Sequence, residues 1–246
     1  MTADTTAYCP TFIDLGAEFE ATFESLAHGL ADAEGLDPFG TDARLVPVHA
    51  GDCEVFMAML PAGAGRHHED RGDTWIFALQ GGLRLLADGK EIVLAQGESL
   101  VVSRGTSFDW HADASARLVG MRYLNAAQDS CGIVAIDNAA PLLPSNPPAD
   151  DVLLGARPSC RSGNQFASAD GVFKCGIWDS TPYRRLPIHF HHSELMHLLE
   201  GSVTFSDASG RTATFRRGDT FIIEKGADCS WDSGEYVAKI YAYYRP

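Results

Sequence analysis

The sequence predicts an all-β protein in which two antiparallel β-barrels share one chain and follow an N-terminal helix. From residue 44 onward, short apolar runs of strand length alternate with glycine-rich turns, a pattern typical of antiparallel sandwiches and barrels. One set of glycine spacings occurs in each half of the chain, which indicates a duplicated unit. The first forty residues show the three- and four-residue spacing of a helical face instead.

The chain has 246 residues, of which 45% are hydrophobic, enough for two modest domains. Its net charge of -14 argues against nucleic-acid or anionic-membrane partners, because both require a basic surface. We expect a cytoplasmic protein, since there is no apolar run of membrane-spanning length and the N-terminus does not resemble a signal peptide. The six cysteines form no Cys-x-x-Cys pair, which favours reduced thiols.

Residues 1–43 form the predicted N-terminal helical segment. Thr11 and Asp14 are placed as a capping pair and Gly35 as a stop signal. We expect this helix to dock on a barrel or on a second copy of the chain in a homodimer. One apolar face is formed by residues three or four positions apart: Phe12, Leu15, Phe19, Phe23, Leu26 and Leu30.

The first barrel is predicted over residues 44–124. The Asp88-Gly89 pair between two of its apolar runs is a signal for a tight hairpin turn. The expected strands are the apolar runs 55–60, 75–79, 83–86, 91–94, 100–102 and 118–123.

Residues 125–170 are predicted to be a linker, and the second barrel follows over residues 171–246. Five prolines between positions 141 and 158 interrupt regular structure there. The short-strand pattern then resumes at Val172 and continues to Tyr244.

The duplicated unit is recognised by turns and by one tryptophan. Gly82 with the Asp88-Gly89 turn corresponds to Gly201 with a similar turn in the second half. Aligned in this way, the first half has no set of metal ligands, and the adjacent His67 and His68 would point to opposite faces of a strand. The first barrel is therefore expected to be degenerate. In the first half, spacings of eight and then five residues separate Gly97, Gly105 and Trp110. The same spacings recur in the second half, between Gly218, Gly226 and Trp231.

The segment from Pro187 to Gly201 carries the candidate metal site. His189 and His191 would share one face of a strand, and Glu194 follows after a short turn. Two histidines and a carboxylate form a set that binds divalent transition metals such as Fe, Mn, Ni or Zn. His192 is a weaker candidate ligand, and His197 would face away from Glu194.

These residues resemble the first conserved motif of the cupin superfamily, in which two alternate histidines, a glutamate and a later glycine recur. The segment from Gly218 to Trp231 resembles the second motif. The chain departs from the family pattern where Glu224 replaces the usual proline and Cys229 replaces the last histidine ligand. The spacing between His191 and Glu194 is also one residue shorter than usual.

The resemblance implies a bicupin with double-stranded β-helix (jelly-roll) barrels. The end of the chain is similar to small cupins related to ureidoglycine aminohydrolase and ethanolamine-utilisation proteins. The ligands of the aminohydrolase would map near Ile188, Phe190 and Glu194, on the opposite strand face from His189 and His191.

Three residues are candidates for contacting a bound small molecule: Arg184, Cys229 and Trp231. Arg184 and its neighbour Arg185 could hold a carboxylate or form surface ion pairs. Cys229 could be a metal-softening thiolate or a small buried hydrophobe. Trp231 belongs to a set of aromatic residues that line a pocket or belong to the core.

Two functions follow from these patterns. In the first, the C-terminal barrel binds a divalent metal and binds or transforms a small polar or carboxylate-bearing metabolite. In the second, the protein is a non-catalytic binder or sensor of a small molecule without bound metal. No catalytic residue is assigned, because one fold hosts many reactions.

Overall fold

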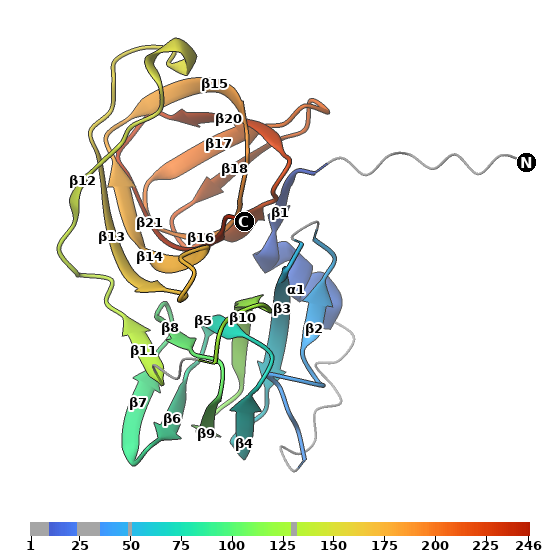
Figure 1. Ribbon diagram of the computed structural model, residues 1–246. Helices are drawn as coiled ribbons and strands as arrows, with labels where there is room; N and C mark the ends of the chain where they lie inside the picture. The colour runs from blue at the N-terminus through green and yellow to red at the C-terminus, as the bar shows by residue number, and fades with distance from the viewer. Residues whose placement is uncertain (1–9, 24–34, 49–50, 129–131) are drawn as a thin grey trace, which may run out of the picture.

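The computed structural model describes residues 10–23, 35–48, 51–128 and 132–246, and it has the predicted all-β architecture with an N-terminal helix. Two barrels lie one above the other in Figure 1, each built from two antiparallel sheets. Among the described residues, no helix is long and apolar enough to cross a membrane.

The N-terminal barrel pairs a six-stranded sheet with a four-stranded sheet. The larger sheet has the order β11-β8-β5-β10-β3-β2 and the smaller one β4-β9-β6-β7. Their bounds are β2 Arg44–Val46, β3 Cys53–Leu60, β4 Gly63–Glu69, β5 Asp73–Gln80, β6 Leu83–Ala87, β7 Lys90–Leu94, β8 Ser99–Val102, β9 Thr106–Ala112, β10 Ala116–Tyr123 and β11 Ile133–Ile136.

The C-terminal barrel repeats this plan with a seven-stranded and a four-stranded sheet. The orders are β1-β19-β16-β21-β14-β13-β12 and β15-β20-β17-β18. Their bounds are β1 Phe12–Asp14, β12 Leu143–Ser145, β13 Cys160–Ala167, β14 Phe173–Ser180, β15 Tyr183–His189, β16 Ser193–Glu200, β17 Ser202–Ser206, β18 Thr212–Arg216, β19 Thr220–Ile223, β20 Asp228–Ser233 and β21 Val237–Tyr244.

The N-terminal helix begins later than the spacing predicts. Residues 12–14 form strand β1, which pairs with β19 of the C-terminal barrel, and helix α1 spans Leu15–Phe23. Asp14 caps this helix, since its Oδ1 accepts a hydrogen bond from the N–H of Ala17 at 3.0 Å. The predicted helical positions 26 and 30 lie outside the described residues.

Glu224, the residue found in place of the usual proline, anchors strand β1. Its side-chain Oε2 accepts a hydrogen bond from the N–H of Thr11 at 2.9 Å, and its own N–H donates to the Thr11 carbonyl at 2.9 Å. Proline could not make the second bond, because it has no N–H. The departure from the family pattern therefore ties the start of the chain to the C-terminal barrel.

The strand register corrects the alignment of the two halves by one residue. Asp88 and Gly89 both have positive φ, as expected for the turn joining β6 and β7. At the end of β5, however, Gly81 has a φ of 69°, which matches Gly201 with a φ of 78°. Alignment of Gly82 with Gly201 would match Trp75 with Glu194, whereas the register matches Thr74 with Glu194. Thr74 pairs with the penultimate residue of β10 and Glu194 with that of β21.

The large sheets of the two barrels pack against each other through a shared apolar core. Trp75 and Phe77 of β5 belong to the same buried cluster as Leu195 of β16 and Ile222 of β19. His197, on the same face of β16 as Leu195, lies with its ring 4.3 Å from that of Phe77. The barrels thus form one packed unit, and His197 points away from the barrel interior as expected.

The proline-rich segment between the barrels has some regular structure. It contains β11, β12, the 3-10 helix η1 (Asp150–Val152) and the whole of β13. In Figure 1 it runs from β11 in the lower barrel along the side of the upper barrel, and it reaches β15 at the top. Leu153 forms an isolated bridge with Arg185 there. The boundaries of the two domains, the homodimer and the cytoplasmic location stay predictions.

Candidate functional site

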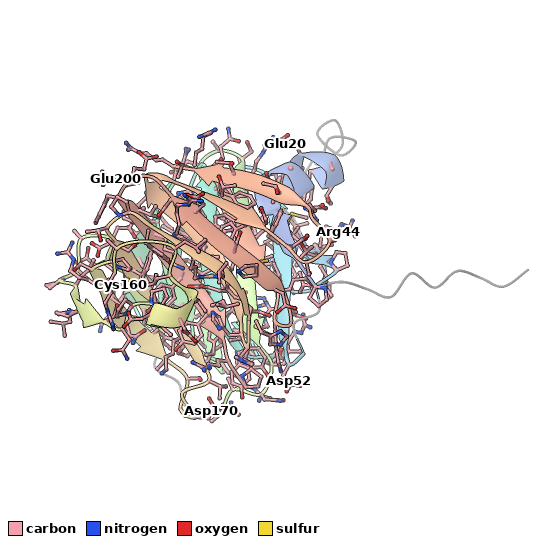
Figure 2. All side chains as sticks on the ribbon, turned by 90° about the horizontal axis from the view of Figure 1, so that it is seen from above. Glu20, Arg44, Asp52, Cys160, Asp170 and Glu200 are labelled. Carbon is pink, nitrogen blue, oxygen red and sulfur yellow. The ribbon has the colours of Figure 1, made fainter. Side chains whose placement is uncertain are left out.

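The C-terminal barrel encloses a cavity of about 420 Å³ between its two sheets. Ser145 to Pro148 of the inter-barrel segment form part of its wall. Cys160, which is labelled in the view from above in Figure 2, also lines the cavity. The wall is rich in large apolar and aromatic side chains: Trp178, Tyr183, Phe190, Met196, Trp231 and Tyr241.

Two opposite charges lie side by side in this cavity. Lys239 of β21 places its Nζ 2.8 Å from Oε1 of Glu194 on β16, and both side chains are largely buried. The Nε2 atom of His192 lies 3.6 Å from Oε2 of the same carboxylate. Burial acts to raise the pKa of Glu194, but the ammonium and the imidazole outweigh it and hold that pKa at about 2. Glu194 is therefore an ionised, paired carboxylate at neutral pH.

Arg185 of β15 brings a second cation to the cavity. The residue is 4% exposed, and its Nη1 donates to the carbonyls of Leu186 and Cys229 at 3.2 and 2.6 Å. Burial lowers its pKa, and the nearby Tyr183 oxygen partly opposes that effect. Within the described ranges, no carboxylate oxygen lies within 4 Å of its guanidinium. The cavity therefore holds a buried positive charge without an ionic partner.

The neighbouring Arg184, the residue predicted to contact a ligand, lies on the outside. Its side chain is 61% exposed, and its Nε lies 3.1 Å from Oδ2 of Asp232. Alternation along β15 turns Arg184 to solvent and Arg185 to the interior. The cavity-facing arginine is thus one residue further along the chain, and Arg184 forms the surface ion pair that the sequence left as an alternative.

The three predicted metal ligands do not come together. His189 is half exposed and its Nδ1 lies 3.2 Å from Oδ1 of Asp228, while His191 is exposed with its ring 5.0 Å from that of His189. Glu194 instead faces the cavity, on the other side of the strand layer. The expectation that two imidazoles and this carboxylate converge is therefore wrong in its geometry.

A bulge in β15 explains the difference. Arg185 is paired with Trp231 and Ile188 with Cys229, so three steps along β15 match only two along β20. One extra residue reverses the alternation, so that Ile188 and Phe190 face the cavity. Pro187 lies within the bulge, and proline inside a strand pattern is a known sign of such an irregularity.

The other two residues predicted to contact a ligand differ in their positions. Cys229 is fully buried in the apolar core of the barrel, which agrees with a small hydrophobe rather than a metal ligand. Trp231 lines the cavity, and its Nε1 donates to Oγ of Ser233 at 3.0 Å. Its contact with a ligand stays a prediction.

The donor set of the cavity does not suit a divalent cation. Among the described residues that line it, Glu194 is the only carboxylate and His192 the only imidazole, and the carboxylate is already paired with Lys239. In the described part of the chain, no three His, Cys, Asp or Glu side chains are arranged to hold a metal ion. The ammonium of Lys239 and the guanidinium of Arg185 would also repel a metal cation.

The interior of the N-terminal barrel is filled by the protein itself. Phe39 is 1% exposed and packs against Phe108, and its carbonyl accepts a hydrogen bond from the buried Arg122. His67 turns inward, with Nδ1 2.8 Å from Oδ1 of Asp37, whereas the adjacent His68 is exposed. In the part of the chain that the structure describes, Phe39, Phe108 and Arg122 therefore occupy the interior of this barrel, and a pocket of about 660 Å³ lies beside His67.

The comparisons with known families and structures agree with this architecture. A cupin domain model matches residues 55–121, and a EutQ-like cupin domain model matches residues 167–241. No functionally curated protein shows significant sequence similarity to the chain.

Two solved structures illustrate the similarity over the whole chain. A Pseudomonas syringae pv. tomato protein of unknown function from the DUF861 family is 29% identical, with a TM-score of 0.78 and coverage of 98% of this chain and 96% of that one. Salicylate 1,2-dioxygenase from Pseudaminobacter salicylatoxidans is 9% identical, with a TM-score of 0.63 and coverage of 99% and 88%, so it shares the fold alone. Since a cupin model matches each half, the chain belongs to the cupin superfamily and contains two cupin barrels.

Proposed function

We propose that the C-terminal barrel binds a small organic carboxylate and does so without a metal ion. The observation that carries this proposal is Arg185, a buried guanidinium that faces a cavity and has no carboxylate partner in the described part of the chain. An unpaired buried charge is costly, and a ligand carboxylate would relieve that cost through charge-assisted hydrogen bonds.

The charges of the cavity favour a monoanion. Glu194 neutralises Lys239, which leaves Arg185 as the buried charge available to the ligand, whereas Arg245, the other cation in the wall, is exposed. The ionised carboxylate of Glu194 would repel a second negative group on the ligand. The aromatic and aliphatic wall would hold an apolar body, as in other small-molecule sites. Salicylate 1,2-dioxygenase, which shares the fold, has been solved with gentisate, also an organic carboxylate.

Adjacent arginines provide a matched test of this proposal. The probe is 3-phenylpropionate, which has one carboxylate and an apolar body. Arg185→Gln is expected to weaken its binding by about 10- to 100-fold, because a charged hydrogen bond contributes about 1.5–3 kcal/mol. Arg184→Gln should leave the affinity within about twofold, since that side chain is exposed on the outer face. Isothermal titration calorimetry at pH 7 measures both, with the neutral 3-phenylpropionamide as a ligand control. If the wild type does not bind the acid, or if both variants bind it equally, the proposal fails.

Metal content separates this proposal from the metal-dependent function. Protein purified without a histidine tag and incubated with Fe(II), Mn(II), Ni(II) or Zn(II) is expected to retain less than about 0.1 ion per chain by elemental analysis, because the ligand set is incomplete. A full equivalent of metal that is lost in His189→Ala and His191→Ala but kept in His197→Ala would instead support the ligands predicted from the sequence.

A further inference from the structure

Lys239 is held in one position by four neighbours in the cavity of the C-terminal barrel. Its side chain is 7% exposed, and its Nζ lies 2.8 Å from Oε1 of Glu194 and 3.0 Å from Sδ of Met196. The same atom lies 4.9 Å from the ring centre of Trp178 and 5.8 Å from that of Trp231. Such cation–π contacts fix the ammonium further.

This ammonium has hydrogen-bonding capacity to spare. A lysine ammonium carries three N–H donors, and a thioether sulfur is only a weak acceptor. Glu194 takes one donor and Met196 a second, and no acceptor within the described ranges takes the third. Glu194, whose pKa is held at about 2, is ionised at neutral pH and accepts one of these hydrogen bonds. An oxygen atom of a ligand in the cavity would satisfy the remaining N–H.

Lys239 and Arg185 are both neighbours of the same tryptophan, Trp231. Arg185 on β15 is the cross-strand partner of Trp231 on β20, so their Cβ atoms are about 5 Å apart. Lys239 lies over the ring of that tryptophan from the opposite sheet, and all three side chains line the cavity. One small molecule can therefore reach both cations.

We infer that the ligand is a hydroxy acid, whose carboxylate pairs with Arg185 and whose hydroxyl oxygen accepts a hydrogen bond from Lys239. This inference rests on the proposed carboxylate site and adds the chemical class of its ligand. The second oxygen is neutral, since Glu194 beside Lys239 would repel another anion.

The test compares three acids that differ by one hydroxyl group. 3-Phenylpropionate measures the carboxylate site alone, and its 2-hydroxy and 3-hydroxy derivatives add a neutral oxygen at two distances from the carboxylate. At least one hydroxy acid is expected to bind the wild-type protein about fivefold to tenfold more tightly than 3-phenylpropionate, as titration calorimetry would show.

The protein variants assign that gain to the lysine. In the double variant Lys239→Met with Glu194→Gln, which removes both members of the ion pair, the gain should vanish while the affinity for 3-phenylpropionate stays within about threefold. The single variant Glu194→Gln keeps the ammonium and should keep the preference for the hydroxy acid.

Three results would overturn the inference: no hydroxy acid binds more tightly, the gain persists in the double variant, or that variant also loses 3-phenylpropionate. A protein that binds 3-phenylpropionate through Arg185 without any preference for a hydroxyl group would retain the proposed function and refute only the assignment to Lys239.

Discussion

Replacing Arg122 by alanine is expected to lower the free energy of unfolding by about 3–5 kcal/mol, the usual cost of leaving a buried charge without its partner. Arg122 is fully buried inside the N-terminal barrel, and its Nη2 lies 3.0 Å from Oε2 of Glu69, which is 1% exposed. Its Nη1 pairs with Glu54, and its Nε donates to Oγ1 of Thr74 at 2.8 Å. Alanine would leave both carboxylates without this cation. Urea denaturation at pH 7 measures the loss.

The same strand offers a matched control for this prediction. Arg117 of β10 also forms an ion pair, with Glu20, but its side chain is 34% exposed. Arg117→Ala should therefore cost less than about 1 kcal/mol, as for other surface pairs. The double variant Arg122→Met with Glu69→Gln removes both charges of the pair between Arg122 and Glu69. It should therefore be more stable than Arg122→Ala, although less stable than the wild type. Equal losses for Arg122→Ala and Arg117→Ala would contradict the prediction.

Much of the fold could be predicted because its signals are local. Apolar runs and turn residues define strands such as 55–60, which the structure extends to Cys53–Leu60. The turn at Asp88 and Gly89 needs positive φ at both positions, and the residue types alone indicate it. Strand β4 was missed because it is largely polar, with Arg66 and two histidines among its seven residues.

The start of the chain shows why a local pattern can mislead. Phe12 fits the spacing of a helical face, yet it lies in strand β1 and pairs with Ile223, which is more than 200 positions away in the sequence. Sequence spacing cannot show that a vacant sheet edge is available at such a distance. Edge pairing with β19 therefore prevailed over the helical pattern for three residues, and the helix begins only at Leu15.

The histidine motif lies in the barrel that has the cavity, but the sequence pattern assigns its side chains to the wrong strand face. Regular alternation from Arg185 would place His189 inside, and the bulge at Pro187 reverses this assignment. The sequence pattern does not indicate Lys239 as a cavity residue, because its ion pair with Glu194 joins positions 45 residues apart. The cavity is therefore a product of long-range packing, whereas the histidine-rich motif describes only the local order of residues.

His197 should make the stability of the protein depend on pH between about 6.5 and 4. Its ring packs on Phe77 of the other barrel, and its Nδ1 lies 2.8 Å from Oγ1 of Thr220. Burial lowers the pKa of this imidazole to about 4, against about 6.5 in an unfolded chain. In this range the unfolded state binds more protons than the folded state, so acidification favours unfolding.

The sign and size of the effect follow from the two pKa values. The contribution of neutral His197 is fully present above pH 6.5, declines as the pH falls, and is lost near pH 4, which amounts to at most about 3 kcal/mol. His197→Gln cannot take up a proton there, so the difference in unfolding free energy between wild type and variant should shrink or change sign from pH 7 to pH 4. Urea denaturation at several pH values measures this difference, in which all other titrating groups cancel. Parallel curves for the two proteins would show that the imidazole is free to ionise in the folded state, and the contact between the barrels would then have to be looser than the packing of His197 on Phe77 implies.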